Sequence, residues 1–224
     1  MDATRAAAIV LRKEIRAEMR TRELLQTTVT FVIIVVVLFS FAFEPTAAEA
    51  RRYGPGLLWI ALLFSGSLML NPSFAKEQSN DTIYALRMAP VSPFSIYLGK
   101  MLANLVFLAI TEAVLLPVFA VLYNVSLWPV LGRLVVVLFL GTFGIAVTGT
   151  VFSAVATQAR MREVLLPLLL LPVLVPLLIA SVEATAELFA DAPSLDRTWV
   201  AVLVAFDVVF FVTAWMLSDY LLEE

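Results

Sequence analysis

Six apolar stretches, each long enough to cross a lipid bilayer, account for most of this 224-residue chain. A hydrocarbon core about 30 Å thick needs about 20 helical residues to cross it. The predicted spans, which carry almost no charge, are residues 27–43, 57–74, 102–123, 130–152, 164–182 and 200–217. The sequence therefore predicts an all-α polytopic membrane protein with one membrane domain over residues 1–224, and it excludes a soluble enzyme.

The composition excludes several kinds of chemistry. The chain has no Cys and no His, so it lacks a thiolate nucleophile, an imidazole base and the usual ligands of zinc and haem. It also lacks the glycine-rich loop that cradles nucleotide phosphates. We therefore expect no catalytic residue, no metal site and no directly bound cofactor. If the protein uses ATP, another chain must bind it.

The basic residues are distributed unevenly between the two sides of the predicted membrane domain. Eleven of the fifteen Lys and Arg residues precede the first span or lie between spans two and three or four and five. Loops rich in Lys and Arg stay in the cytoplasm during membrane insertion. This distribution predicts that both termini are cytoplasmic.

Residues 1–26 are predicted to form an amphipathic helix at the cytoplasmic surface. One face is apolar at helical spacing and contains Ala8, Leu11, Ile15 and Met19. Beside it runs an arginine stripe with one residue per turn: Arg12, Arg16 and Arg20. Such a helix lies with its apolar face among lipids and its cations at the head groups. The arginines either set only this topology or also contact a cytoplasmic partner.

The cytoplasmic stretch 76–100 is predicted to carry two helices. A short helix over residues 83–88 must end near Pro90, because a proline disfavours helical backbone at the residue before it. Ser92 can then cap a second helix that has Pro93 in its first turn. We expect both helices at the membrane surface, where the short one either rests on lipid or docks a partner.

Two carboxyl groups, Glu112 and Asp207, fall inside predicted spans, with Asp207 expected nearer a span end. Ionisable groups are costly in lipid and usually face the helix bundle or a water-filled cavity. Glu112 shares one face with Asn104 and Leu108, so this face should point inward. Each carboxyl is either functional or a protonated group hydrogen-bonded to a neighbouring helix.

The fourth span carries small residues at every fourth position, namely Thr142, Ala146, Thr150 and Ala154. Small residues at this spacing let helix backbones approach closely, so the pattern predicts tight packing rather than chemistry.

The fifth span contains three prolines, Pro167, Pro172 and Pro176. Each removes a backbone donor and clashes with the preceding turn. Carbonyl groups freed in this way are tolerated at membrane depth only against protein or water. The prolines predict either a static kink or a deformable wall beside a pathway or a partner.

These features together resemble the type-2 ABC exporter permeases and, within them, the CcmB family. The similarity is densest in the segments 74–77 (FAKE), 86–90 (LRMAP) and 98–100 (LGK), and in the proline-rich segment 166–179 (LPLLLLPVLVPLLI). The family often has more charge and a glycine after the glutamate, where this chain has residues 78–82 (QSNDT). The resemblance covers nearly the whole chain.

The resemblance implies a membrane subunit of a haem-handling complex in cytochrome c maturation. It implies a dimer of this chain in the bacterial inner membrane, docked on a CcmA-type ATPase and joined by CcmC- and CcmD-type subunits. This assembly would release a haem-loaded CcmE-type chaperone. Haem and ATP would be handled by the partners, and no nucleic acid is expected. The helix around residues 81–88 would couple to the ATPase, through residues drawn from Glu77, Asp81, Ile83, Leu86, Arg87 and Pro90.

Three alternatives remain from the sequence. A type-2 permease for another cargo, such as a lipid, a polysaccharide or a drug, would have the same architecture. A pure membrane scaffold is a second alternative. An intramembrane enzyme using Glu112 and Asp207 is the third, and the lack of a His, a metal site or a paired-carboxylate motif argues against it.

Overall fold

In the part of the chain that the computed structural model describes, six helices are long and apolar enough to cross a membrane, as the sequence predicts. The structure describes residues 3–43, 47–71, 73–74, 91–156 and 162–223. Its helices in chain order are α1 (Ala3–Thr21), α2 (Glu23–Phe43), α3 (Ala47–Leu70), α6 (Pro93–Leu122), the 3₁₀ turn η1 (Trp128–Val130), α7 (Leu131–Ala156), α8 (Arg162–Phe189) and α9 (Arg197–Glu223). The described residues contain no β-strand.

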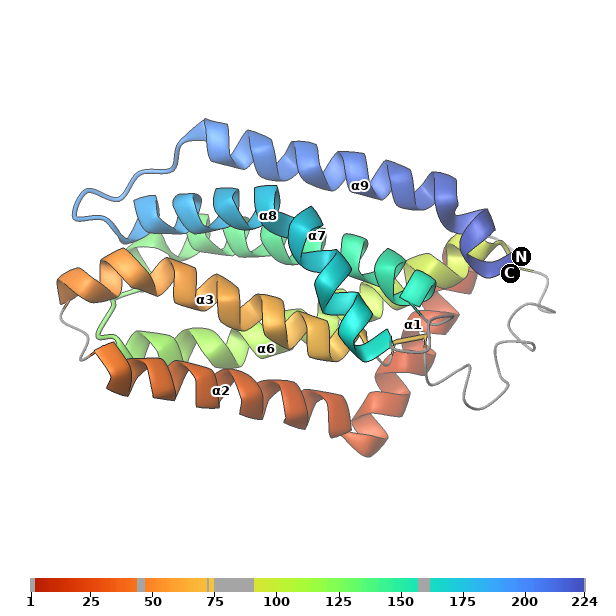
Figure 1. The fold of residues 1–224 in the computed structure, drawn as a ribbon, viewed down its shortest axis with the longest axis horizontal. Coiled ribbons are helices and arrows are strands. Elements are labelled where there is room, and N and C mark those ends of the chain that lie inside the picture. Colours follow the sequence, from red (N-terminus) through yellow and green to blue (C-terminus); the bar gives the residue numbers. More distant parts are fainter. Residues whose placement is uncertain (1–2, 44–46, 72, 75–90, 157–161, 224) are drawn as a thin grey trace.

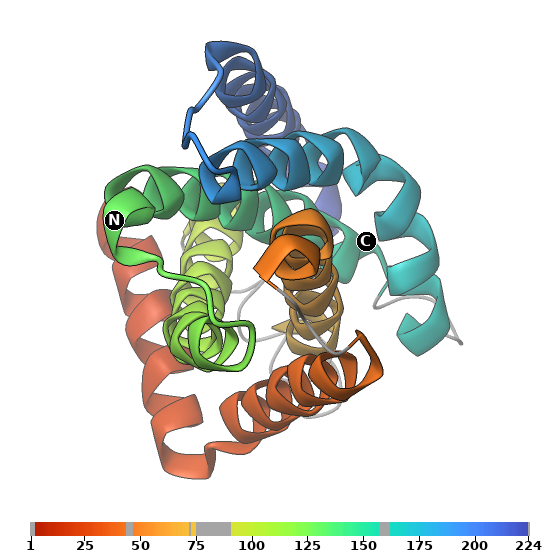
Figure 2. The same ribbon diagram turned by 90° about the vertical axis from the view of Figure 1, so that its left-hand side faces the viewer.

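The six long helices run side by side, and both termini lie at the same end of the bundle (Figure 1). Helix α1 crosses that end at a steep angle to α2 (Figure 1). Seen from the opposite end, α3 occupies the middle of the bundle (Figure 2). It packs against α2, α6, α7 and α8. The bundle is therefore built around α3.

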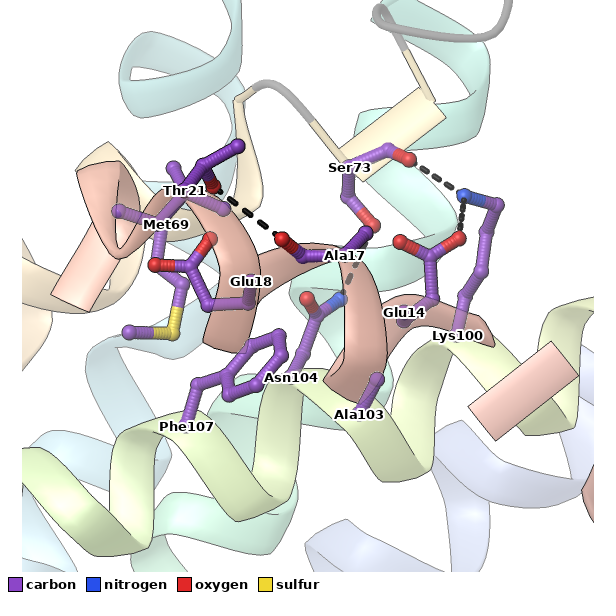
Figure 3. A pocket seen from close by; sticks show the side chains of 11 residues that line it. Glu14, Ala17, Glu18, Thr21, Met69, Ser73, Lys100, Ala103, Asn104 and Phe107 are labelled. Carbon is purple, nitrogen blue, oxygen red and sulfur yellow. Dashed lines mark hydrogen bonds and ion pairs between the residues drawn. The ribbon is translucent and has the colours of Figure 1, made fainter. Parts of the chain in front are cut away.

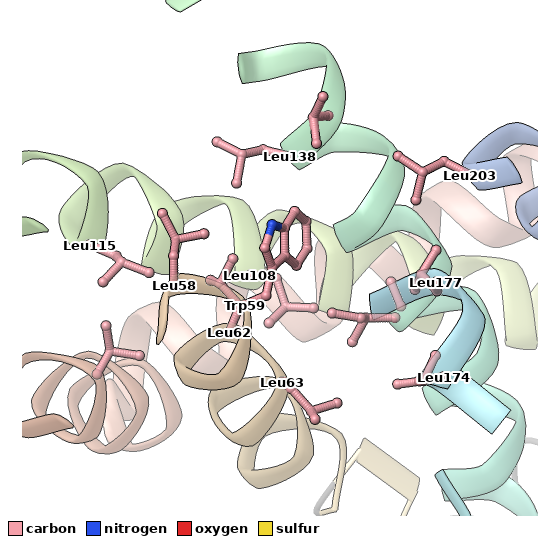
Figure 4. Packing of buried hydrophobic residues seen from close by; sticks show 14 of the residues in the cluster. Leu58, Trp59, Leu62, Leu63, Leu108, Leu115, Leu138, Leu174, Leu177 and Leu203 are labelled. Atoms are coloured by element: carbon pink, nitrogen blue, oxygen red, sulfur yellow. The ribbon is translucent and has the colours of Figure 1, made fainter. Parts of the chain in front are cut away.

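The centre of the core is Trp59 on α3, which is completely buried among leucines from α6, α7, α8 and α9 (Figure 4). Its ring lies against Gly141 of α7, where an added Cβ would stand only 2.1 Å from a ring carbon. Its Nε1 donates a hydrogen bond of 2.9 Å to Thr185 Oγ1 on α8. A buried indole N–H needs such a partner, so Trp59 fixes the spacing of three helices.

Helices α3 and α8 extend well beyond the predicted spans. Helix α3 starts at Ala47 and contains Pro55, although the predicted span begins only at residue 57. Alanine, glutamate and arginine are good helix formers and fill its first turns. Helix α8 continues to Phe189, beyond the expected end of its span at residue 182. Packing of Ala184 and Leu188 into the core accounts for this extension.

A single residue, Arg22, separates α1 from α2. Its φ of 56° is in the left-handed region, which non-glycine residues rarely adopt. The turn is held by Glu18, whose Oε1 accepts a 2.9 Å hydrogen bond from the backbone N–H of Leu25. This turn sends α1 across the end of the bundle (Figure 1).

Candidate functional site

The amphipathic helix α1 docks on the first turns of α6. Ala6, Ala7 and Val10 are buried in this contact. Gly99 makes it possible, because a Cβ at this position would lie 2.6 Å from the Val10 Cβ and 2.7 Å from the Ala7 carbonyl oxygen. The two backbones therefore meet at a distance that only glycine permits.

The docked face of α1 is not the predicted apolar face. Leu11 and Ile15 are half-buried, whereas Ala8 and Met19 are exposed. The docked residues lie beside this face around the helix, because Gly99 fixes which side of α1 can approach α6. The predicted face is thus left pointing partly outward, which suits contact with lipid.

Lys100 is the centre of a polar junction between α1, α3 and α6. It is 1% exposed. Its Nζ donates hydrogen bonds to Glu14 Oε1 on α1, at 3.0 Å, and to the Ser73 carbonyl oxygen, at 2.5 Å. The same Nζ lies 4.7 Å from the centre of the Phe74 ring. A buried ammonium group needs partners of this kind, so Lys100 links three segments that are far apart in the sequence.

Glu14 is the charged partner of this lysine. Its Oε1 also pairs with Lys13 Nζ at 3.2 Å. Burial raises the pKa of Glu14, but the charges of Lys100 and Lys13 outweigh burial and leave the pKa below its usual value. Glu14 is therefore ionised at neutral pH, and the contact is a true ion pair.

Further hydrogen bonds tie α3 and α6 to α7. Asn104 Nδ2 donates to Ser73 Oγ at 3.3 Å and to Thr150 Oγ1 at 3.0 Å. Ser153 Oγ donates to the carbonyl oxygen of Leu70 at 2.7 Å. These bonds fasten the end of α3 to helices that follow later in the chain.

A cavity of about 160 Å³ opens beside the junction (Figure 3). Its polar lining comes from Glu14, Glu18, Thr21, Ser73, Lys100 and Asn104. Figure 3 shows Lys100 pointing toward both Glu14 and Ser73. The cavity is lined in part by residues of α1, the helix that crosses this end of the bundle (Figure 1).

The predicted ATPase-coupling residues Glu77, Asp81, Ile83, Leu86, Arg87 and Pro90 lie outside the described residues. The structure does describe both flanks of this stretch. Before it, Ser73 and Phe74 contact Lys100. After it, α6 begins at Pro93, as predicted, and Ser92 stands at the N-cap position in extended conformation. The predicted capping bond is absent, because the Ser92 side chain makes no hydrogen bond to the backbone of the helix and pairs instead with Ser95 Oγ at 2.6 Å.

The second helix of the expected cytoplasmic stretch is not a separate surface helix. Residues 93–100 form the start of α6, which continues without a break across the membrane. The prediction placed the span only from residue 102. The early start is explained by burial, because Tyr97 lies in the core and donates a 3.0 Å hydrogen bond from its OH to the Val147 carbonyl oxygen.

The arginine stripe is exposed along its whole length. Within the described part of the chain, its three guanidinium groups form no ion pair. The stripe lies on the side of α1 away from the α6 contact. Whether it meets only lipid or also a partner stays a prediction.

Glu112 lies on the inward face of α6, together with Asn104 and Leu108, as predicted. Its Oε1 accepts a hydrogen bond from Thr142 Oγ1 on α7. Asp207 is also buried, and it lies halfway along the α9 span rather than near an end. Within the described residues neither of its oxygens has a hydrogen-bond partner. The two carboxyl groups therefore occupy different environments.

The small residues of the fourth span pack closely, as predicted. The every-fourth-residue set from Thr142 to Ala154 is buried. A Cβ at Gly149 would lie 2.2 Å from a methyl carbon of Leu70 on α3. The small side chains of α7 thus bring it close to α3 and α8.

The three prolines lie inside α8, which remains one helix and bends sharply in both views (Figures 1 and 2). Pro172 and Pro176 are exposed on the surface of the chain, and Pro167 is half-buried. The predicted kink is therefore present. Its ability to deform stays a prediction.

The sequence reasoning missed Glu14 and Ser73 as parts of the junction. A signal for Glu14 was present, since Glu14 and Glu18 lie on the side of a basic helix away from its arginines. Nothing in the sequence marks Ser73. Across the described ranges, no group of three or more Asp or Glu residues is arranged to hold a metal ion.

Among the described residues, six span-length helices and an amphipathic helix held across their ends define a multi-pass membrane protein. The chain belongs to the CcmB family, because residues 5–218 match the model of that family, described as CcmB protein. Heme exporter protein B of Bradyrhizobium diazoefficiens is 27% identical over 207 residues, which is 92% of each chain. The proteins of the same name from Rhodobacter capsulatus and Paracoccus denitrificans are 30% and 33% identical, over 78% and 72% of this chain and 79% and 74% of their own.

Proposed function

We propose that this chain is the membrane permease subunit of a haem exporter that serves cytochrome c maturation. It transmits work from a separate ATPase chain to the membrane helices and thereby drives release of a haem-loaded chaperone. Family membership and the names of its relatives support the assignment to a haem exporter.

The observation that carries the coupling role is the junction at Lys100. Residues 75–90, which contain the proposed ATPase-docking residues, are flanked by Ser73 and Phe74 on one side and by α6 on the other. Lys100 of α6 bonds back to Ser73, so the two flanks are joined directly. A displacement of this stretch would therefore move α3 and α6 together.

The same junction would carry the displacement further. Glu14 connects Lys100 to α1, and α1 continues through Arg22 into α2. Asn104 connects the junction to Thr150 of α7. Four of the six spans thus have a hydrogen-bonded or covalent link to the flanks of the docking stretch, which is the arrangement a mechanical coupler needs.

The proposed assembly contains a second copy of this chain, a CcmA-type ATPase, and CcmC- and CcmD-type membrane subunits. It would lie in a bacterial inner membrane with both termini of this chain in the cytoplasm, on the side where α1 crosses the bundle. ATP and haem would bind to the partner subunits.

Copurification with native partners tests this proposal, together with the charge substitutions Ile83→Asp and Leu86→Asp. An apolar contact interrupted by two carboxylates loses about 2 kcal/mol or more. We expect the double variant to insert normally but to lose the ATPase and ATP-dependent chaperone release. The control is Thr4→Asp with Gln26→Asp, which adds the same charge at exposed positions at the same end of the bundle. Normal copurification of the Ile83/Leu86 variant would contradict the docking assignment.

A further inference from the structure

Asp207 is a buried carboxyl group that the proposed coupling route does not use. It is 5% exposed and lies halfway along the 22-residue span of α9. Its Oδ1 stands 2.7 Å from the position that a Cβ on Gly144 of α7 would occupy, and a methyl carbon of Leu177 on α8 is equally close to that point. The carboxyl group therefore fills a slot that exists only because residue 144 is glycine.

Buried polar atoms without a hydrogen-bond partner lie along the same side of α7. Gly141, Gly144 and Thr148 follow one another at a spacing of about one turn. Ser181 Oγ stands 2.8 Å from the position of a Cβ on Gly141. Within the described residues, Ser181 Oγ, Thr148 Oγ1 and both Asp207 oxygens have no hydrogen-bond partner although all are buried. We call this contact of α7, α8 and α9 the polar seam.

No described cation compensates a negative charge on Asp207. Helix α9 packs against α6, α7 and α8. The ionisable side chains of these helices include Glu112, whose Oε1 is bonded to Thr142, and groups toward their ends. Lys100 bonds to Glu14 and Ser73 near the start of α6, and Arg133 near the start of α7 donates to the Pro193 carbonyl oxygen. Glu187, near the end of α8, bonds to Asp196 and Trp199.

An ionised Asp207 would lose its water shell and gain neither a hydrogen bond nor a positive neighbour in exchange. Such a group is strongly disfavoured in the middle of a membrane. A proton removes the charge and so removes the largest cost of burying this group. The neutral acid is thus the form that this seam accommodates.

We propose that Asp207 is a proton-binding site, whose carboxyl group holds a proton at neutral pH, and that this proton allows α9 to pack against α7 and α8. Loss of the proton would place an unpaired anion in the polar seam. Either water would then enter the seam or α9 would move away from Gly144. This inference does not depend on the partners or the cargo of the protein.

Infrared difference spectroscopy on the purified native complex in lipid nanodiscs tests the proposal directly. We expect the wild-type protein to show the carbonyl stretch of a protonated carboxylic acid that is absent from Asp207→Asn. The band should shift when the complex is transferred to heavy water. Glu112→Gln is the matched control, because it removes the other intramembrane carboxyl and identifies any band that belongs to it. Loss of carboxylate bands in Asp207→Asn, with no loss of an acid band, would overturn the proposal.

The pH dependence of thermal stability is the second measurement. The unfolded chain releases this proton readily, whereas the folded seam retains it, so the wild-type complex should lose stability as the pH rises. Asparagine mimics the neutral acid, and Asp207→Asn should keep the complex yield and lose this part of the pH dependence. An unchanged pH dependence in Asp207→Asn would contradict proton binding. So would a wild-type stability that rises with sodium concentration at constant pH, because it would indicate a metal cation in the seam.

Discussion

Replacing Lys100 by methionine should release α1 from the bundle. Methionine keeps the length and the apolar stem of lysine but removes the ammonium group, so Glu14 and the Ser73 carbonyl oxygen lose their shared donor. Breaking a buried ion pair from one side costs about 3–5 kcal/mol. The Glu14 side chain is 23% exposed and keeps its contact with Lys13, so the expected loss is lower, about 2 kcal/mol.

The double variant Lys100→Met with Glu14→Leu separates the ion pair from general damage. With both charges removed, no buried charge is left unpaired, and the stability should recover most of the way toward wild type.

The same ion pair predicts a pH effect. Because the pKa of Glu14 is lowered in the folded protein from the ordinary value of 4.5, its contribution is present above about pH 4.5 and is lost as the pH falls through the folded value.

The assay uses the absence of cysteine from the chain. Cysteines introduced at the exposed positions Thr4 and Thr198 can carry spin labels, and the distance between them reports how far α1 lies from the start of α9. We expect one narrow distance distribution in the wild-type complex and in the double variant, and a broad one in Lys100→Met. A narrow distribution and wild-type stability in Lys100→Met would refute the role of this lysine as the centre of the junction.

Three further substitutions test other contacts. Gly99→Val should undock α1, since even a Cβ would collide with Val10, and the spin-label distances should broaden as they do for Lys100→Met. Replacing the three arginines of the stripe by lysine should leave complex assembly nearly unchanged if the stripe meets only lipid head groups. If the arginines make bidentate contacts to a partner, the lysine variant should lose these contacts and assemble less well. Pro172→Leu with Pro176→Leu restores two backbone donors, so α8 should straighten. We expect this variant to form the complex at normal yield but to release less chaperone. Full release would show that the bend is dispensable.

The spans could be predicted because a bilayer imposes one length and one polarity on every crossing helix. The inward direction of Glu112 followed from the same constraint, since a carboxyl group cannot face lipid. The start of α6 after Ser92 was predictable because Pro93 fits the first turn of a helix, although the predicted capping bond of the Ser92 side chain does not form. Each of these conclusions depends on local sequence and on the solvent.

The contacts of α1 could not be predicted in this way. Leu11 and Ile15 are more apolar than Ala7, yet Ala7 and Val10 make the close contact, because Gly99 of a distant helix has no Cβ that would block their approach. The burial of Lys100 is equally non-local, because its partners come from α1 and from the residues that follow α3. Such features depend on which helices meet, and periodicity within one helix does not report that.

The one-residue joint at Arg22 has a mechanical consequence. Helices α1 and α2 meet at a sharp bend at Arg22. The hydrogen bond from the backbone N–H of Leu25 to Glu18 Oε1 stabilises this bend. Few of the residues in the α2 span are buried, and α2 packs mainly on α3 and α6, with a smaller contact to α1. Because this bend is held in place, a tilt of α1 along the membrane surface would also tilt α2 within the bilayer. A change in the tilt of α1 would then move the other end of α2, which lies on the opposite side of the membrane.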